Sequence, residues 1–596
     1  MSSAPSRLSL LVVPTALFAG LGAAITVAVL PLPLPWLPPL MLALLVVSYA
    51  QLAVSAFGPL LGVAARAPLE TGLETGPETG QDAPAWRPRT ALLVPIYNEP
   101  PEPVAATIRI MAEALDPADR VAVFVLSDTQ SPAVAAGEAE LFPALAMARS
   151  GVEVHYRRRP RNTGRKAGNI AEFCANAGRG YDFAIVLDAD SLMTADAIRA
   201  LILAMAGDAR CGLIQSVSYA VGGRTLFARM QQFAGRLGTP LAVAGQHLWQ
   251  GRRGTYWGHN AILRLSAFTS DAVLPVLPGQ APMGGEILCH DTIEAALLLR
   301  AGWEVRLAPA ITGSYETTPS NIIDHLARER RWCQGNMQHL RLIAAPRLRP
   351  ESRVHIGIGI LHYLVSPAGL LVSALLLGAS LLPGIRATPP AGLVEALAWF
   401  SAALLFGPRL LSLARALLLP GAARGFGGRG RLLASALVEQ VATALLAPVL
   451  AVSVTGFVLN TLAGRVVSWD APARGDRPVG PREAWRRLRW HTAIGMGLFA
   501  ALALAQPGAL PWAMPFLLGL IFAVPAAVCS GSVRLGELAR RLGLFLTEDE
   551  LTPTAELAAL SAFERAATRP RTLAPEWHPA PLPYRTSALQ ASSAAE

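Results

Sequence analysis

Lysine is almost absent from this chain of 596 residues: it occurs once, at Lys166, whereas arginine occurs fifty times. Charged residues make up only 15% of the chain, and hydrophobic residues make up 52%. This balance is typical of proteins with several membrane-spanning helices. The net charge of +10 fits arginines at the cytoplasmic ends of such helices and a site for anionic substrates. Since no basic run is interleaved with aromatic residues, we expect no nucleic-acid partner.

Cysteine is also scarce. The five cysteines are scattered along the chain and form no Cys-x-x-Cys pair. This argues against a disulfide framework and against structural zinc, and it fits a reducing compartment. The first apolar stretch, near residues 8–30, is too long for a signal-peptide core and lacks a convincing cleavage site. We expect it to be retained as a span.

Apolar runs of bilayer length lie on both sides of a more polar middle. Two occur within residues 1–60, and a polar linker with short ETG echoes follows at 61–88. Over residues 89–345, short β-rich runs alternate with helical stretches, as in a mostly parallel sheet. Later apolar runs lie near 354–383, 392–418, 431–463, 490–506 and 511–530. The sequence therefore predicts a multi-pass α-helical membrane protein with an inserted cytoplasmic α/β domain. We expect membrane and interfacial helices over 346–532 and a cytoplasmic tail over 533–596.

The run at 431–463 is unusual because arginines flank it on both sides, in the loops at 419–431 and 465–489. Both loops are predicted to be cytoplasmic, so the run must begin and end on the same side of the membrane. It also contains Glu439 and Pro448. An in-plane amphipathic helix, a re-entrant pair or a tight hairpin satisfies this pattern, and one straight span does not. The number of spans is left at seven or eight.

Acidic residues follow three predicted strands of the middle region. The first strand leads into Tyr97 and Glu99, the next into Asp128, and a third into Asp188 and Asp190. Ligands of open α/β sheets bind beyond the carboxyl ends of the strands. One such acid is usually an ordinary turn residue, but three strand ends together predict a site at one edge of the sheet.

Asp188 and Asp190 alternate along the chain, so their side chains would point to opposite faces of an ideal strand. Where the chain bends at the strand end, both can approach one divalent ion, which uses oxygen ligands and commonly binds phosphates as well. An acidic strand-to-loop cap is the simpler alternative. A bare Asp-x-Asp pattern occurs often by chance.

Lys166 lies between the second and third of these strands, in a predicted loop that Gly164 and Gly168 flank. A compact ammonium can settle against a phosphate or base oxygen where a broad, planar guanidinium does not fit. The alternative is a stray codon in an arginine-biased gene. With fifty arginines against one lysine, we favour the functional interpretation.

Two further motifs lie before the next apolar run. Asp291 opens an apolar-periodic helix, where it is either a first-turn acid or a general base for a sugar hydroxyl. The second motif joins Arg328, Arg330 and Arg331 to Trp332. Such a cluster is either a positive-inside flank with an interfacial tryptophan or a site that pairs a diphosphate and stacks on a sugar ring.

Taken in order, these motifs resemble the family 2 processive glycosyltransferases, with the GT-A fold of cellulose and hyaluronan synthases. The exact residues of several motifs, including GRKAGN, YWGHNAILR, CHDT and RRWCQGN, are similar to those of the periplasmic glucan biosynthesis glucosyltransferase H family. The resemblance is strong over 89–345. It extends to the membrane part through its layout and, more weakly, through the stretch at 469–472.

The resemblance implies a role for each matched residue. Asp128 contacts uridine in a pocket that Tyr97 and Glu99 line, and Lys166 and Asp188 lie at the nucleotide. The remaining roles are Asp190 as ligand of Mg²⁺ (or Mn²⁺), Asp291 as catalytic base, Arg328 and Arg331 at the diphosphate, and Trp332, His259 and Asn260 at the acceptor.

The resemblance further implies inverting transfer from UDP-glucose into a β-1,2-glucan. The growing chain would cross the bacterial inner membrane, with acyl carrier protein as a partner. Two departures from cellulose synthases, Arg328 in place of glutamine and His290 in place of glutamate, favour the periplasmic glucan. Alternatives are a cellulose- or hyaluronan-type synthase, a transferase with a lipid acceptor, and a transporter whose soluble domain senses a nucleotide.

Overall fold

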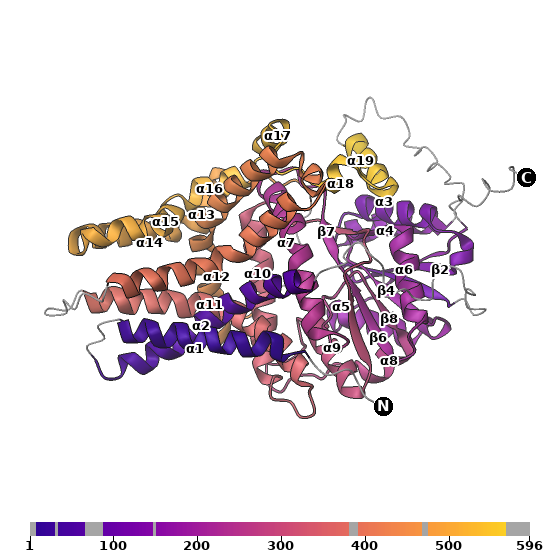
Figure 1. Ribbon diagram of the computed structural model, residues 1–596. Helices are drawn as coiled ribbons and strands as arrows, with labels where there is room; N and C mark the ends of the chain where they lie inside the picture. The colour runs from indigo at the N-terminus through magenta and orange to yellow at the C-terminus, as the bar shows by residue number, and fades with distance from the viewer. Residues whose placement is uncertain are drawn as a thin grey trace, which may run out of the picture.

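The computed structural model describes residues 7–29, 34–65, 88–146, 151–380, 391–467 and 475–567. Long helices extend to one side, and an α/β part lies on the other (Figure 1). Most of the predicted linker at 61–88 and the motif at 469–472 lie outside the described residues, as does the end of the chain from 568.

Within the described residues, the α/β part contains ten short strands. They are β1 (Thr90–Ile96), β2 (Val121–Ser127), β3 (Val154–Arg158), β4 (Phe183–Val186), β5 (Leu192–Met193), β6 (Cys211–Ser216), β7 (Ser218–Ala220), β8 (Ala261–Arg264), β9 (Glu304–Ala308) and β10 (Ser314–Glu316). Its main helices are α3 (Pro101–Ala114), α4 (Pro132–Ala146), α5 (Arg165–Ala175), α6 (Ala195–Ala206), α7 (Leu226–Gln250), α8 (Leu265–Asp271), α9 (His290–Ala301) and α10 (Ile322–Gln338).

Seven strands form the central sheet, in the order β3-β2-β1-β4-β8-β6-β9. Neighbouring strands are parallel except at β8, which is antiparallel to both β4 and β6. The mostly parallel sheet is as predicted. β1 and β2 are buried almost throughout, because helices cover both faces, and their sequences are nearly continuous apolar runs. A second, smaller sheet has the order β5-β10-β7.

Two apolar cores pack against the two faces of the central sheet. One joins the sheet to α3, α4 and α6 through residues such as Ile108, Phe142 and Ile198. The other joins it to α5, α8 and α9 through Phe173, Phe268 and Leu298. This sandwich holds the carboxyl ends of β1, β2 and β4 at one edge, where the predicted site residues begin.

Five helices of the described residues are long and apolar enough to cross a membrane: α1 (Ser9–Val29), α2 (Leu37–Ala64), α11 (Pro350–Ser380), α12 (Ala391–Leu418) and α13 (Arg429–Leu462). A bent pair, 507–521 with α16 (Ala523–Ser530), turns by 57° and makes a sixth if it is one span. The pair includes α15 (Leu510–Ile521). The predicted run at 490–506 lies in α14 (Pro481–Ala505), which is not among the five.

The run at 431–463 forms one continuous helix, α13, which passes through Pro448. The tight hairpin and the re-entrant pair predicted as two of its possible forms are therefore wrong. Proline removes one backbone hydrogen bond within a helix but does not require a reversal of the chain. The in-plane arrangement stays a prediction. α13 contacts α10, α11 and α15, so it lies where the apolar helices meet the α/β part.

The end of the described chain packs back onto the α/β part. It forms α17 (Val533–Arg541), α18 (Glu548–Leu551) and α19 (Ala555–Ala567). α19 lies over α3 (Figure 1), and Leu557 belongs to the core beneath it. Glu550 pairs with the buried Arg229 of α7 at 2.9 Å. The first half of the predicted tail is therefore integral to the domain.

Candidate active site

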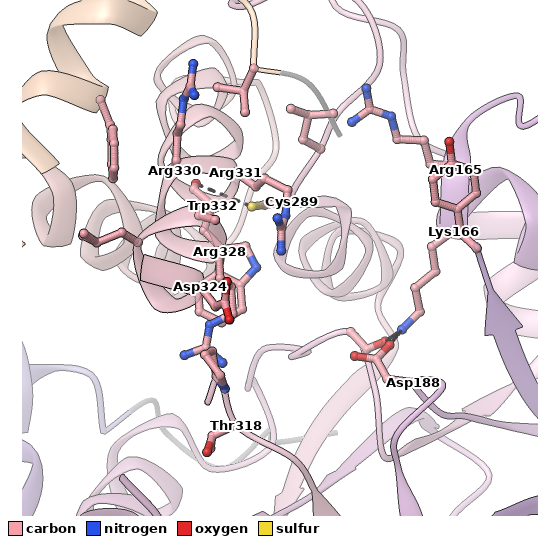
Figure 2. Close-up of a pocket in the computed structure, with 18 of the residues that line it drawn as sticks. Arg165, Lys166, Asp188, Cys289, Thr318, Asp324, Arg328, Arg330, Arg331 and Trp332 are labelled. Carbon is pink, nitrogen blue, oxygen red and sulfur yellow. Dashed lines mark hydrogen bonds and ion pairs between the residues drawn. The ribbon is translucent and has the colours of Figure 1, made fainter. Parts of the chain in front are cut away.

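A cavity of about 970 Å³ lies between the carboxyl edge of the sheet and the helices α10, α13 and α14. Figure 2 shows its two sides, with Lys166 and Asp188 facing Arg328, Arg331 and Trp332 across open space. The predicted site residues on its wall are Tyr97, Glu99, Asp128, Lys166, Asp188, Asp190, His259, Asp291, Arg328, Arg331 and Trp332. Of the predicted set, Asn260 alone is not on the wall.

The ends of β1, β2 and β4 gather their acids at one edge, as predicted from three separate motifs. These strands are parallel neighbours in the sheet. Glu99 and Asp128 are both buried, and a Glu99 carboxylate oxygen accepts a hydrogen bond from the Tyr97 backbone N–H. The loops after β1 and β2 are joined, because the Asn98 N–H donates to Thr129 Oγ1 at 2.9 Å.

Asp128 is held by a buried arginine that sequence reasoning missed. Arg159 donates from Nε to Asp128 Oδ1 at 2.6 Å and from Nη2 to Oδ2 at 2.8 Å. Burial lowers the pKa of Arg159, but hydrogen bonds and charge from Asp128 outweigh this and the net pKa is raised. The pair fixes the orientation of the Asp128 carboxylate. Arg159 follows β3, a short edge strand that its mostly polar sequence did not reveal.

Lys166 is in the first turn of helix α5, and the prediction of a loop is wrong at this position. The turn before it is irregular, with Gly164 and Arg165 both at positive φ, which is why the glycine-flanked sequence resembled a loop. The helix continues because Gly168 has no side chain: a Cβ there would overlap the Thr163 carbonyl.

The ammonium of Lys166 lies between two oxygens. Its Nζ forms an ion pair with Asp188 Oδ1 and donates to the Gly258 carbonyl at 2.8 Å. This bridge ties α5 to the strand end that carries Asp188 and to the loop before β8. A single-point cation can satisfy both acceptors in this narrow space.

Asp188 and Asp190 lie on a tight turn after β4. The Asp188 N–H donates to Ser191 Oγ at 2.9 Å, and the Ser191 N–H donates to the Asp188 carbonyl at 3.0 Å. Thr317 donates its hydroxyl to Asp190. Because the turn replaces extended strand, both carboxylates reach the same cavity.

The described residues contain no cluster of three or more His, Cys, Asp or Glu side chains that could hold a metal alone. A hard divalent cation commonly takes one or two carboxylates and completes its shell with phosphate oxygens and water. Asp188 and Asp190 fit that mode. Burial raises the pKa of the nearby Glu316, and its neighbours Asp190 and Asp188 raise it further.

Asp291 is the second residue of α9, where its charge faces the positive end of the helix dipole. The loop before β8 comes close to it at Gly258, which has φ +88°; a Cβ there would lie 3.3 Å from Asp291 Oδ2. Next to it, His290 bonds Glu294 at 2.9 Å. Burial lowers the pKa of His290, but the charge of Glu294 outweighs this and the net pKa is raised.

The segment 256–260 divides between cavity and core. Trp257 and His259 line the cavity, and His259 Nε2 lies 3.3 Å from Glu316 Oε2. Asn260 is fully buried, and its Nδ2 donates to Ser314 Oγ at 2.7 Å. The structure thus places Asn260 away from the cavity, where its amide joins the start of β8 to β10, and its predicted acceptor contact stays a prediction.

Helix α10 supplies the basic side of the cavity. The guanidinium of Arg328 lies over the Trp332 ring, 4.6 Å from its centroid, and Trp332 is 44% exposed. Arg330 and Arg331 also line the cavity. Close packing fixes the helix, because a Cβ on Gly335 would overlap the Cys289 thiol.

The far wall comes from α13, α14 and the segment before α14, and sequence reasoning did not identify these residues. They include Ser453, Phe457 and Asn460 of α13, Arg487 and His491 of α14, and Arg477. His491 Nε2 lies 2.9 Å from Ser453 Oγ. Arg477 joins Asp324 at 2.6 Å to Glu483 at 2.9 Å. These positions follow the end of α10 by more than a hundred residues in the sequence. Only the fold brings them to the site.

Comparison with known proteins gives a consistent result. Residues 91–270 match the family described as "Glycosyl transferase family 2", and residues 183–417 match the family described as "Glycosyl transferase family group 2". Glucans biosynthesis glucosyltransferase H of Caulobacter vibrioides is 40% identical over 497 residues, with 80% of this chain and 75% of the relative covered. The protein of that name from Vibrio cholerae is 40% identical over 492 residues, with 79% and 68% covered.

Among solved structures, the mannosyltransferase PcManGT from Pyrobaculum calidifontis, in complex with GDP-Man and Mn²⁺, is similar with a TM-score of 0.39 and 17% identity. The match covers 62% of this chain and 98% of that one.

Proposed function

Because the chain belongs to the glucans biosynthesis glucosyltransferase H family of family 2 glycosyltransferases, we propose that it polymerises glucose from UDP-glucose into a β-1,2-glucan. The α/β part has the GT-A glycosyltransferase fold, and the apolar helices would carry the product across the bacterial inner membrane. We place the α/β part in the cytoplasm, where UDP-glucose is made. Acyl carrier protein is a further proposed partner, on family resemblance alone.

One observation carries the proposal: a single cavity holds the strand-end acids, Lys166, Asp291 and the arginines of α10 together. The acids and Lys166 form a nucleotide side, and Asp291 faces them from the start of α9. A nucleotide sensor would need no base opposite its ligand. This favours transfer over the sensor alternative.

The donor would bind with its uracil near Asp128, Tyr97 and Glu99, and its diphosphate between Asp190 and the arginines of α10. Asp190 and Asp188 would hold the divalent cation, Mg²⁺ or Mn²⁺, that neutralises charge on the leaving diphosphate when it is bound. Arg328 and Arg331 lie opposite and add positive charge where the leaving group develops.

Asp291 would accept the proton of the acceptor hydroxyl as that oxygen attacks the anomeric carbon. The new C–O bond forms while the bond to the UDP oxygen breaks, so an α-linked donor gives a β-linked product. Trp332 would stack on the acceptor sugar, and His259 would contact it nearby. The Ser453 and His491 pair lies on the wall that α13 and α14 give to the same cavity, on the path we propose for the growing chain.

The test is product analysis. The purified full chain would be incubated with radiolabelled UDP-glucose and Mg²⁺, and the polymer analysed for linkage. We expect β-1,2 bonds that a β-1,2-specific glucanase removes. β-1,4 linkage, or use of UDP-N-acetylglucosamine with UDP-glucuronate, would instead assign a cellulose- or hyaluronan-type synthase. Binding of UDP-glucose without any transfer would support the sensor.

A further inference from the structure

Two helices that begin side by side carry seven exposed arginines, of which Arg487 lines the cavity and Arg540 pairs with Glu550. Arg482, Arg486 and Arg489 lie on the first turns of α14, and Arg534 and Arg541 lie on α17. We call these five the basic rim. The two helix starts are adjacent, because a Cβ on Gly531 would lie 2.9 Å from the Val479 backbone nitrogen. The rim is therefore one local surface built from two distant segments.

Large apolar side chains are exposed between these arginines. On α14 they are Trp485 and Trp490, which are 54% and 67% exposed. On α17, Leu538 and Leu542 are 51% and 62% exposed and share one helix face with Arg534 and Arg541, at spacings of four, seven and eight residues. Its other face, with Gly536 and Ala539, is buried and α17 contacts α7. Mixed arginine, tryptophan and leucine faces suit a membrane–water boundary.

The surface of α14 changes from basic to apolar beyond Arg489. Met496 and Leu504 are 59% and 89% exposed, and Trp512 after the turn is 86% exposed. At 1.5 Å per residue, Arg489 and Leu504 are separated by about 22 Å along the axis, which lies within the ~30 Å depth of a bilayer core. The basic turns from Arg482 to Arg489 cover a further ~10 Å, which reaches across and just beyond the headgroup layer of about 5–7 Å on each side.

The acidic residues near the rim are engaged elsewhere. Glu483 pairs with Arg477 at 2.9 Å, and Glu537 pairs with Arg224 at 3.3 Å. The rim therefore presents a positive surface at the boundary between exposed apolar side chains and the α/β part. Anionic headgroups have the complementary charge and geometry.

We propose that the basic rim binds the headgroups of anionic phospholipids and that this holds α14 at a fixed depth. The same helix turns contribute Arg487 and His491 to the cavity wall. Lipid bound at the rim would thus stabilise the wall that the proposed acceptor path shares. The surface is independent of the donor, so its test does not depend on the proposed reaction.

The experiment measures lipid selectivity of the full chain reconstituted in phosphatidylcholine bilayers, by electron spin resonance of spin-labelled lipids. We expect spin-labelled phosphatidylglycerol to be preferred over phosphatidylcholine by about threefold or more, and the preference to fall in 0.5 M salt. In the R482Q/R486Q/R489Q/R534Q/R541Q variant, selectivity should fall to about one. The R482Q/R486Q/R489Q and R534Q/R541Q variants, measured separately, should each lose part of it.

The matched control is R158Q/R179Q/R300Q, which removes three exposed arginines of the α/β part and should keep wild-type selectivity. The proposal is overturned if the rim variants elute and melt like wild type yet keep full selectivity, or if the control loses it equally. Salt-sensitive binding of labelled duplex DNA that depends on the rim, without lipid selectivity, would also overturn it.

Discussion

The cavity has two walls that are built in different ways. The strand wall comes from segments between residues 95 and 190, which end on three neighbouring parallel strands. The helix wall comes from α9, α10, α13 and α14, which are spread over about two hundred residues. A parallel sheet holds its strand ends in fixed register, whereas separate helices are placed only by packing. We therefore propose that the strand wall binds the nucleotide of the donor, and that the helix wall supplies the base, the acceptor contacts and the arginines that face the diphosphate.

Replacement of the proposed base should separate the two walls most clearly. In Asp291→Asn, we expect the rate of transfer to fall about 10²–10⁴-fold, because an amide does not accept the acceptor proton. UDP affinity should stay within about twofold, since the strand wall is unchanged. Radiolabelled product formation and calorimetric titration of UDP would check both expectations.

Asp196→Asn is the matched control, because Asp196 is an exposed acid at the same second position of helix α6. It should keep full activity. Full activity in Asp291→Asn would show that Asp291 is not the catalytic base.

Loss of the buried guanidinium of Arg159, which holds Asp128 of the strand wall, should lower the stability of the folded protein strongly. The side chains of Arg159 and Asp128 are each 5% exposed. Arg159→Met should lower the free energy of unfolding by about 3–5 kcal/mol, because it leaves a buried carboxylate unpaired. Thermal unfolding would measure this.

The double variant Asp128→Asn/Arg159→Met should recover part of the loss. Arg109→Gln breaks the more exposed pair with Glu113 and should change the same quantity by at most about 0.5 kcal/mol. Equal losses in the two arginine variants would show that the buried pair is not special.

The single lysine allows a finer test of the strand wall. In Lys166→Arg, we expect the KM for UDP-glucose to rise about tenfold with a small change in kcat, because the broad guanidinium cannot occupy the space between Asp188 and Gly258. Steady-state kinetics with varied donor would measure it.

The reverse change Arg158→Lys, at an exposed position, should leave the kinetics unaltered. An unchanged KM in Lys166→Arg would make the lone lysine an accident of codon usage.

The stability of the folded state should fall in acid because of a buried histidine on α10, one of the helices of the helix wall. Burial, aided by Arg328, lowers the pKa of His325 from 6.5 to about 3. The folded state therefore disfavours the proton, so stability is full above pH 6.5 and is lost as pH falls from 6.5 towards 3. The loss is about 1.4 kcal/mol for each pH unit below 6.5.

His325→Gln should flatten the dependence of the unfolding temperature on pH between 7 and 5. His155→Gln, at an exposed position on β3, should not. A variant at position 325 with the wild-type slope would contradict the neutral, buried state of this imidazole.

Sequence patterns predicted the strand wall well because its chemistry lies at local transitions. Asp128 and Asp188 each occur where an apolar run meets a polar turn, and such boundaries are visible without any long-range contact. Lys166 was found from the composition, but its helix was missed because the flanking glycines suggested a loop. In the structure, Gly164 and Arg165 have positive φ, and the helix begins at Arg165. Asn260 was assigned to the acceptor by its motif, although its side chain points into the core.

Local pattern could not reveal partners that are chosen by packing. In the sequence, Arg159 is one of several neighbouring arginines. Only its burial against Asp128 distinguishes it from the others. The pairing of His491 with Ser453 depends on how α14 crosses α13. Charge argued against one straight span over 431–463 and left a hairpin, a re-entrant pair and an in-plane helix open; only the structure shows that the backbone continues through Pro448 as one helix.

The sequence by itself determined three strands of the α/β part, the acids at their ends and the division into apolar helices and an α/β part, because periodicity and turn chemistry are local. Only the tertiary structure decided which side chains face one another across the cavity. Burial, ion pairing and helix crossing depend on contacts between residues far apart in the chain, and no local pattern encodes them.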